Sequence, residues 1–491
     1  MSREPMVTDR AARQVTLQPA EAELRELSLA SAAARTTRHG SVNVRTRVHT
    51  RARRSTFVVL DTDRGGRSPV TATMLRADAD RVARLQEDHL AEVGQVVVDG
   101  YLGAPGPLRL GLRVVTETAF AWLAGMERHL LFDPVADPDF EPDLTVVSTP
   151  SLEVPGAPDG VLVIVWPEQG TTRVTGTDFF GETKKAATRM WAERVYDAGG
   201  LVLHAGCLVA PSERGSSTVL VLGPPDSGKS TLVLRDPSAA RLVQDDFVAL
   251  LPGGRVVAAE NGCIEKTWGL SARRQPVLHA AVTCPETYLE NVPQRGATPH
   301  FAASDGPRHS RAVFPLRSVG GLADDPVPPL ALFLLLDPGH DLAPAAARVD
   351  HAQVPGYFLL RERGDQLAER SGRHGNRLAT LLTSSQTDAV VVNSSVVPRD
   401  PPGSPRLGAW PLLAALLDGS VSWHVDEHLR VAAAGSVPGV PDPDTVWPRR
   451  RYERVGQMSE YAQLLDDLRA TWRDYLGEFA GLDPGIAAAV T

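Results

Sequence analysis

The sequence predicts an α/β protein with room for two or three domains, and three observations support this class. Apolar runs rich in valine and leucine, among them FVVLDT at 57–62, TVLVLG at 218–223 and LALFLLLD at 330–337, are bounded by glycine, proline and aspartate, as buried strands are. The segment at 460–480 has the spacing of an amphipathic helix that closes the chain. A length of 491 residues is enough for two or three domains of ordinary size.

The composition is that of a globular protein and argues against two classes of partner. Hydrophobic residues make up 43% of the chain and charged residues 22%, which is ordinary for a soluble protein. A net charge of -8 argues against a general nucleic-acid binder. The apolar run at 330–336 is too short to cross a bilayer, and the first residues lack the apolar core of a signal peptide. We therefore expect neither nucleic acid nor a membrane as a partner.

The cysteines indicate the compartment. Cys207, Cys263 and Cys284 are odd in number and widely spaced, so they form neither a disulfide framework nor a CxxC metal site. This usage is typical of a reducing compartment, and we expect a cytoplasmic protein.

Two stretches are expected to lie outside the packed core. The segment at 35–54, RTTRHGSVNVRTRVHTRARR, is basic and has no hydrophobic periodicity. We expect residues 1–55 to form a solvated, partly ordered leader, with a nucleic-acid-binding arm as the alternative. The stretch at 397–408 is rich in proline and glycine and predicts a loop.

A phosphate-binding loop is the first motif with a mechanism. In VLVLGPPDSGKSTLVL, Gly223, Gly228, Lys229 and Ser230 have the spacing G-x-x-x-x-G-K-[ST], directly after a predicted strand and before a predicted helix. The backbone N–H groups of such a loop hold phosphates, the lysine reaches the β and γ oxygens, and the hydroxyl binds a divalent cation. An ordinary glycine-rich turn is the alternative. We expect ATP to be bound by the loop residues Gly223, Asp226, Ser227, Gly228, Lys229, Ser230 and Thr231.

Two adjacent carboxylates follow the next apolar strand. In RLVQDDFVALL the strand ends at Asp245 and Asp246. A turn explains such a pair when it stands alone, but beside a phosphate loop carboxylate oxygens are the ligands that Mg²⁺ and Mn²⁺ require. We therefore expect a metal site there.

The rarity of lysine marks further candidates for chemistry. Of the 51 lysines and arginines only four are lysines, Lys184, Lys185, Lys229 and Lys266. An ammonium is a compact charge whose pKa shifts readily on burial, whereas a guanidinium stays protonated. Two of the four stand side by side in GETKKAA, at 181–187.

Over a long stretch the chain resembles the ATP-dependent phosphoenolpyruvate carboxykinase family. The similarity rests on VVVDGYLGA (96–104), FEPDLTVVSTPSLEV (140–154), VTGTDFFGETKKAA (174–187), LVQDDF (242–247) and AENGCIEKTWGLSARRQP (259–276), and it covers about residues 55 to 480. The resemblance implies a two-domain carboxykinase-like fold. An N-terminal substrate-binding domain would span 56–200, and a C-terminal P-loop domain that binds nucleotide and metal would span 201–491. A monomer or small homo-oligomer is expected.

The resemblance also implies a set of metal ligands. By position in the family motifs, Lys185 is a neutral-amine ligand of Mn²⁺, and His204, Asp246 and the Ser230 hydroxyl are the other ligands. An arginine cannot replace Lys185 there because it cannot lose its proton. Nitrogen donors with oxygen ligands suit Mn²⁺ better than Mg²⁺.

Other catalytic residues follow from the same motifs. Lys266 in NGCIEK corresponds to a lysine that neutralises phosphate charge, and Lys184 and Asp245 lie beside the ligands. Arg67 in GGRSP corresponds to the arginine that holds the substrate carboxylate, and Arg311 in HSRAVFP to one that bridges the substrate and the transferred phosphoryl group. The resemblance thus implies a small anionic carboxylate substrate.

Three departures from the family pattern leave the reaction open. Phe179 replaces a tyrosine, the segment after GYFLLRERG at 356–364 is short where the family has a mobile lid, and the adenine-binding segment is changed. A lid keeps water away from a reactive enolate. We therefore expect a kinase that phosphorylates another small carboxylate without decarboxylation. The alternative is a true carboxykinase, which converts oxaloacetate and ATP to phosphoenolpyruvate, CO₂ and ADP; a non-catalytic nucleotide sensor fits less well.

Overall fold

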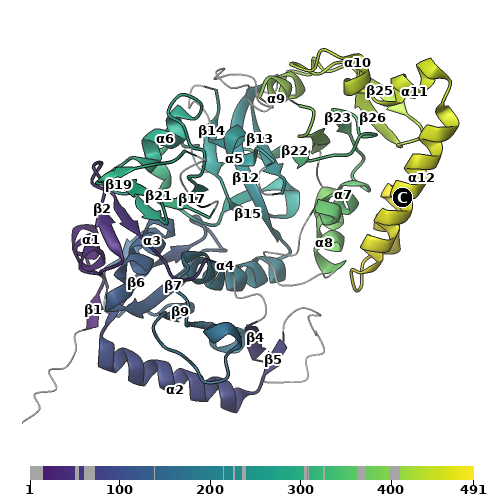
Figure 1. The fold of residues 1–491 in the computed structure, drawn as a ribbon. Coiled ribbons are helices and arrows are strands. Elements are labelled where there is room, and N and C mark those ends of the chain that lie inside the picture. The colour runs from purple at the N-terminus through teal and green to yellow at the C-terminus, as the bar shows by residue number, and fades with distance from the viewer. Residues whose placement is uncertain are drawn as a thin grey trace, which may run out of the picture.

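The protein is a mixed α/β molecule with two large sheets and one small sheet (Figure 1). The computed structural model describes residues 15–49, 55–59, 72–137, 139–213, 215–224, 227–234, 239–302, 307, 309–323, 327–361, 372–383, 385, 387–397 and 410–491. Arg67, Asp226 and most of the proline-rich stretch at 397–408 lie outside these residues.

The first large sheet has nine strands and comes from the N-terminal part of the chain. Its order is β1 (Val15–Leu17), β6 (Gln95–Leu102), β7 (Leu110–Glu117), β9 (Leu144–Thr149), β11 (Thr171–Thr175), β10 (Leu162–Trp166), β4 (Thr56–Val59) and β5 (Ala72–Met74), with β8 (Phe132–Val135) on β6. The helices of this region are α1 (Glu21–Leu29), α2 (Arg76–Val93) and α3 (Ala121–Leu130), and α2 lies along the outer side of the sheet in Figure 1.

The second large sheet has ten strands and carries the phosphate loop. Its order is β16 (Val256–Ala258), β15 (Phe247–Leu250), β12 (Leu201–Ser212), β13 (Gly215–Leu222), β22 (Leu330–Asp337), β24 (Asp388–Asn393), β23 (Ala346–Arg348), β26 (Val431–Ala434) and β25 (Trp423–Asp426), with β14 (Arg241–Gln244) on β12. Strands β13, β22 and β24 are parallel, so their carboxyl ends share one edge. The loop that follows β13 lies at this edge, where open α/β sheets bind ligands.

Helices cover both faces of the second sheet. One face packs against α7 (Val354–Arg361), α8 (Gly372–Thr383), α12 (Met458–Gly477) and α13 (Pro484–Val490). The other packs against α5 (Lys229–Val233), α6 (Pro276–Val282) and α9 (Trp410–Leu417). Two further helices, α10 (Pro443–Val446) and α11 (Arg449–Val455), precede α12, which is the closing helix expected at 460–480.

The small sheet joins two distant parts of the sequence. Its order is β17 (Gly262–Lys266), β21 (Arg311–Pro315), β18 (Tyr288–Glu290), β3 (Val42–Val44) and β2 (Ala34–Thr36), and a separate hairpin pairs β19 (Gln294–Arg295) with β20 (Thr298–Pro299). Residues 15–49 therefore differ from the expected leader, because they form β1, α1, β2 and β3. Three-residue strands are too short to show a hydrophobic period, and exposed basic side chains dominate the composition of this stretch.

Helix α4 (Phe180–Asp197) lies between the two large sheets and contacts β9 and β11 of the first and β12 of the second (Figure 1). One hydrophobic cluster continues through this junction: it contains Val96 and Val114 of the first sheet, Trp191 of α4, and Val202 and Ala249 of the second. The proposed boundary near residue 200 thus crosses a shared core. Among the described helices, none is both long and apolar enough to cross a bilayer.

Candidate active site

The phosphate loop connects β13 to α5, as the motif predicts. At Gly223 a Cβ atom would lie 2.5 Å from the Ser227 Oγ and 2.8 Å from a backbone oxygen, so only glycine fits there. Gly228 has a φ of +99°, a conformation that favours glycine. Thr231 is exposed on α5. The loop geometry therefore depends on both glycines of the motif.

Two buried polar atoms of this loop are ready for a ligand. Within the part of the chain that the structure describes, the Lys229 ammonium and the Ser227 hydroxyl have no hydrogen-bond partner. The Lys229 side chain is only 10% exposed, and burial lowers the pKa of its ammonium. Buried donors without a partner are costly unless a ligand satisfies them, so these two atoms fit the phosphates of a nucleotide.

Asp246 is the centre of the predicted metal site. Its carboxylate pairs with the Lys184 ammonium, its Oδ1 lies 2.7 Å from the His204 Nε2, and the Lys229 Nζ is 3.9 Å away. His204 comes from β12, directly opposite Phe247 of β15, and Lys184 from the N-terminal half of α4. Side chains of α4, β12 and α5 thus converge on one carboxylate.

The electrostatics of this centre favour a deprotonated carboxylate beside a neutral imidazole. Burial alone would raise the pKa of Asp246, but Lys184 and His204 outweigh it and hold that pKa well below its usual value. Burial and, next, the Lys229 charge lower the pKa of His204. Lys184 remains protonated because Asp246 and Glu260 raise its pKa against the effect of burial. A carboxylate and a neutral imidazole are the protonation states that bind a metal.

The two members of the lysine pair stand side by side on α4. Lys184 forms an ion pair with Asp246, and Lys185 is buried one position further along the helix. Successive side chains on a helix point about 100° apart, so the two lysine side chains leave α4 in different directions. Lys185 as a metal ligand stays a prediction.

The predicted metal ligands are of different chemical types and do not form a cluster of acidic side chains. Among the described residues no three His, Cys, Asp or Glu side chains gather as a metal site. The predicted ligands include one imidazole and one carboxylate, from His204 and Asp246, and the remaining donors are an amine and a hydroxyl. His204 and Asp246 already stand within coordination distance of a common point, since their donor atoms are 2.7 Å apart.

Sequence reasoning missed two buried carboxylates at the site. The Glu260 Oε2 lies 3.0 Å from the Lys184 Nζ, and burial raises the pKa of Glu260 to about 7. Glu265 is hydrogen-bonded to Ser230 and lies close to Asp245, and burial raises the pKa of Asp245 well above its usual value. Glu260 directly precedes the recognised stretch NGCIEK and Glu265 lies inside it, so their place in this motif was the available signal.

The small sheet carries the cations on the substrate side. Arg311 on β21 stands directly opposite Lys266 on one neighbouring strand and Glu290 on the other. Side chains of directly opposed residues share a face, so these three form one row. The Arg311 guanidinium lies 5.0 Å from the centre of the Phe179 ring, and burial raises the pKa of Glu290 to about 7. Lys266 is exposed.

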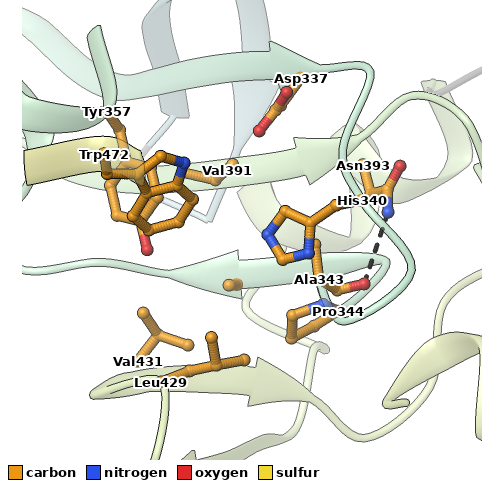
Figure 2. Close-up of a pocket in the computed structure, with 11 residues that line it drawn as sticks. Asp337, His340, Ala343, Pro344, Tyr357, Val391, Asn393, Leu429, Val431 and Trp472 are labelled. Carbon is orange, nitrogen blue, oxygen red and sulfur yellow. Dashed lines mark hydrogen bonds between the residues drawn. The ribbon is translucent and has the colours of Figure 1, made fainter. Parts of the chain in front are cut away.

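A separate cavity of about 30 Å³ lies between the second sheet and helices α7 and α12, away from Asp246 (Figure 2). Its wall includes His340, Tyr357 and Trp472, and Asp337 at its upper side is paired with Arg361. A volume of this size holds about one or two water molecules. This cavity is therefore too small for a nucleotide or a carboxylate substrate.

The phosphate loop, the cations around it and the carboxylate-imidazole pair define a phosphotransferase that binds a nucleotide with a divalent cation. The chain belongs to the phosphoenolpyruvate carboxykinase family, whose ATP-type model matches residues 13–364. The family resemblance that the motifs indicated is thereby confirmed.

Several curated relatives extend the similarity over most of the chain. Proteins named phosphoenolpyruvate carboxykinase (ATP) from Geobacillus thermodenitrificans and Nitrobacter winogradskyi are 26% and 28% identical to it. These matches cover 81% and 75% of this chain and 80% and 76% of the relatives. The protein of the same name from Azorhizobium caulinodans is 26% identical, over 94% of this chain and 91% of its own length. The expected enzyme class, with ATP and a divalent cation as cofactors, is confirmed by this membership.

Proposed function

We propose that this protein catalyses the ATP-dependent conversion of oxaloacetate to phosphoenolpyruvate, CO₂ and ADP. The relatives that cover most of the chain all carry the name of this activity. The observation that carries the proposal is the convergence of Lys184, His204 and Lys229 on Asp246, beside the phosphate loop. The comparisons favour this reaction over the kinase acting on another carboxylate that the sequence analysis preferred.

The residues of the chain have distinct tasks in this reaction. The phosphate loop and Lys229 hold the β and γ phosphates, and Lys266 offsets phosphate charge from the small sheet. Arg311, which packs over Phe179, binds the anionic groups at the point of transfer. His204, Asp246 and Ser230 would hold the divalent cation, with Lys185 as a further ligand. The cation supplies Lewis-acid stabilisation of the enolate oxygen and of the phosphoryl charge.

Arg67 completes the substrate side of this proposal. It lies outside the described residues, and its assignment rests on the motif GGRSP. A planar guanidinium fits a carboxylate with two hydrogen bonds, so Arg67 would orient oxaloacetate for loss of CO₂. We further propose two domains, 56–200 and 201–491, with the site between them, in a cytoplasmic monomer or small homo-oligomer.

One observation favours a second candidate function. Phe179 is 2% exposed and covers the Arg311 guanidinium with an apolar ring, where the family pattern has a tyrosine hydroxyl. A site without this hydroxyl contacts oxaloacetate less well, and a kinase acting on another small carboxylate, without loss of CO₂, fits it equally. A nucleotide sensor without turnover is disfavoured by the assembled phosphate and metal residues.

The test is ³¹P NMR of the protein with ATP, Mn²⁺ and a panel of carboxylates that includes oxaloacetate. If the protein is a carboxykinase, oxaloacetate should be the one carboxylate of the panel that reacts, and it should give phosphoenolpyruvate and CO₂. The variant Phe179→Tyr should raise kcat/KM for oxaloacetate several-fold, since it restores a hydrogen bond at the substrate. A phosphorylated product from another carboxylate, with no CO₂ and no reaction of oxaloacetate, would overturn the proposal in favour of the kinase.

A further inference from the structure

Strand β17 delivers consecutive side chains to two different parts of the active site. Side chains alternate between the faces of a strand, so Glu265 and Lys266 point in opposite directions. Lys266 stands in the row with Arg311. Cys263, on the same face as Glu265, belongs to the core cluster that also contains Leu232 of α5. Glu265 therefore points toward the phosphate loop, from the face of β17 opposite to the one that carries Lys266.

Glu265 is buried beside residues of the phosphate loop, unlike a charged side chain on the protein surface. Its side chain is 8% exposed and is hydrogen-bonded to the Ser230 hydroxyl, and burial raises its pKa. The Lys229 ammonium, which has no hydrogen-bond partner among the described residues, is close enough to interact with the Glu265 charge. A buried carboxylate is costly unless its bonds serve the structure or a ligand.

The bond to Ser230 has a consequence for a metal. A serine hydroxyl carries one proton and two lone pairs, and a carboxylate can only accept that proton. When the Ser230 proton is donated to Glu265, the lone pairs of the hydroxyl oxygen are turned away from the carboxylate. They are then available to a cation on the phosphate side of the loop.

We propose that Glu265 is a positioning residue for the divalent cation that accompanies the nucleotide, acting through the Ser230 hydroxyl. It also places a negative charge close to the phosphate loop. That charge opposes a nucleotide without a cation and is offset when the cation is present, so Glu265 strengthens the coupling between metal and nucleotide. This inference rests on the nucleotide and metal part of the proposed function, and it is independent of the phosphoryl acceptor.

The test compares wild type with Glu265→Gln in binding experiments that contain no acceptor. Mn²⁺ binding is followed by electron paramagnetic resonance at saturating ATP, and ATP binding is followed by calorimetry with the metal chelated. The affinity for Mn²⁺ should fall about tenfold, the usual cost of losing a residue that orients a ligand. The affinity for metal-free ATP should rise, because a negative charge near the phosphates has been removed.

These opposite signs separate positioning from a general structural role. A merely structural Glu265 would lower both affinities in Glu265→Gln, and an unchanged affinity for Mn²⁺ would also overturn the inference. Glu117→Gln is the matched control, since Glu117 is also a buried carboxylate that accepts a serine hydrogen bond, from Ser151, but lies on β7 of the first sheet, and it should change neither affinity. If Glu265→Gln does not fold, Glu265→Asp should lose Mn²⁺ affinity while metal-free ATP binding stays weak. Wild type that fails to bind Mn²⁺ and ATP would contradict the proposed function itself.

Discussion

Lysine and arginine carry the same charge, but only lysine can give up its proton, and two of the four lysines of this chain, Lys184 and Lys229, meet at Asp246. Lys184 stays charged because Asp246 and Glu260 face it, and it neutralises the centre. Lys185 is buried beside it on α4. At the residue scale, two adjacent lysines therefore suit two different tasks, one as a cation and one as an amine donor.

Lys185→Arg tests the second of these tasks. The substitution keeps the charge but removes an amine that can lose its proton, so Mn²⁺-supported turnover should fall at least a hundredfold, while ATP affinity changes by less than about threefold. Steady-state rates with Mn²⁺ and a nucleotide titration measure the two effects. Activity equal to that of wild type would show that Lys185 acts only as a cation.

The sequence was sufficient for some of these residues and insufficient for others. The phosphate loop, His204 and Asp246 could be assigned because each stands in a motif whose spacing fixes its place. The ion pair between Lys184 and Asp246 joins α4 to the end of β14, a long-range contact that no local pattern shows. The partnership of Glu265 with Ser230 depends on how β17 packs against α5, which is a long-range contact.

At the element scale, a close approach at a glycine holds α3 against β18. A Cβ atom on Gly125 would lie 2.3 Å from the Tyr288 Oη, although Gly125 stands in the middle of a helix. Tyr288 is fully buried on the strand that also carries Glu290. The missing side chain thus lets α3 support the sheet that carries Arg311.

Gly125→Ala should therefore destabilise the protein by about 1–3 kcal/mol, the usual cost of overpacking a core, despite the better helix propensity of alanine. Urea unfolding measures the change in the free energy of unfolding. Gly477→Ala is the matched control, because Gly477 also lies in a helix but has no atom within 4 Å of the added Cβ. The control should be neutral or slightly stabilising, and equal effects of the two substitutions would contradict the packing argument.

Helix α8 carries a histidine that makes stability depend on pH. His374 is buried against Tyr196, and burial, with a smaller effect of Arg373, lowers its pKa from 6.5 to about 4. Between these two values the unfolded chain binds a proton that the folded protein does not. Its contribution to stability is therefore present above pH 6.5 and is lost as the pH falls toward 4, by up to about 1.4 kcal/mol per pH unit.

His374→Phe should flatten the fall in stability between pH 6.5 and 4, whatever its effect at neutral pH. Chemical unfolding at several pH values gives the slope directly. His424→Phe, at an exposed position, is the control and should leave the slope unchanged. An unaltered slope in His374→Phe would show that other groups cause the acid sensitivity.

The small sheet shows why some elements could not be predicted from the sequence. Strands β2 and β3 have three residues each, and the pairing of β3 with β18 joins positions that are about 250 residues apart in the chain. The backbone amides of Arg47 and Val48, just after β3, donate to the buried carboxylate of Asp178, directly before α4. Basic composition suggested a solvated leader, but the local backbone is fixed by these distant partners.

At the scale of the whole molecule, the arrangement of the core decides whether the two proposed domains are independent. Motif order predicts a boundary near residue 200, since the strand β12 begins the region of the phosphate loop. The cluster around α4 contradicts independence, because apolar residues of both large sheets contribute to it. The residues of the proposed site come from both sides of the same boundary, with Lys184 on one side and His204 and Asp246 on the other.

Separate expression of 1–200 and 201–491 should therefore give two fragments that do not fold alone. The first would expose α4 residues such as Trp191 and Ala187, and the second would expose Val202, Phe247 and Ala249, all of which are buried in the intact chain. Exposure of this many core residues favours partly folded states. Such states bind hydrophobic dyes and show weak near-ultraviolet circular dichroism. Wild type should instead unfold in one cooperative transition. Two fragments that each unfold cooperatively would show that the core divides at residue 200, and that α4 only joins two independent domains.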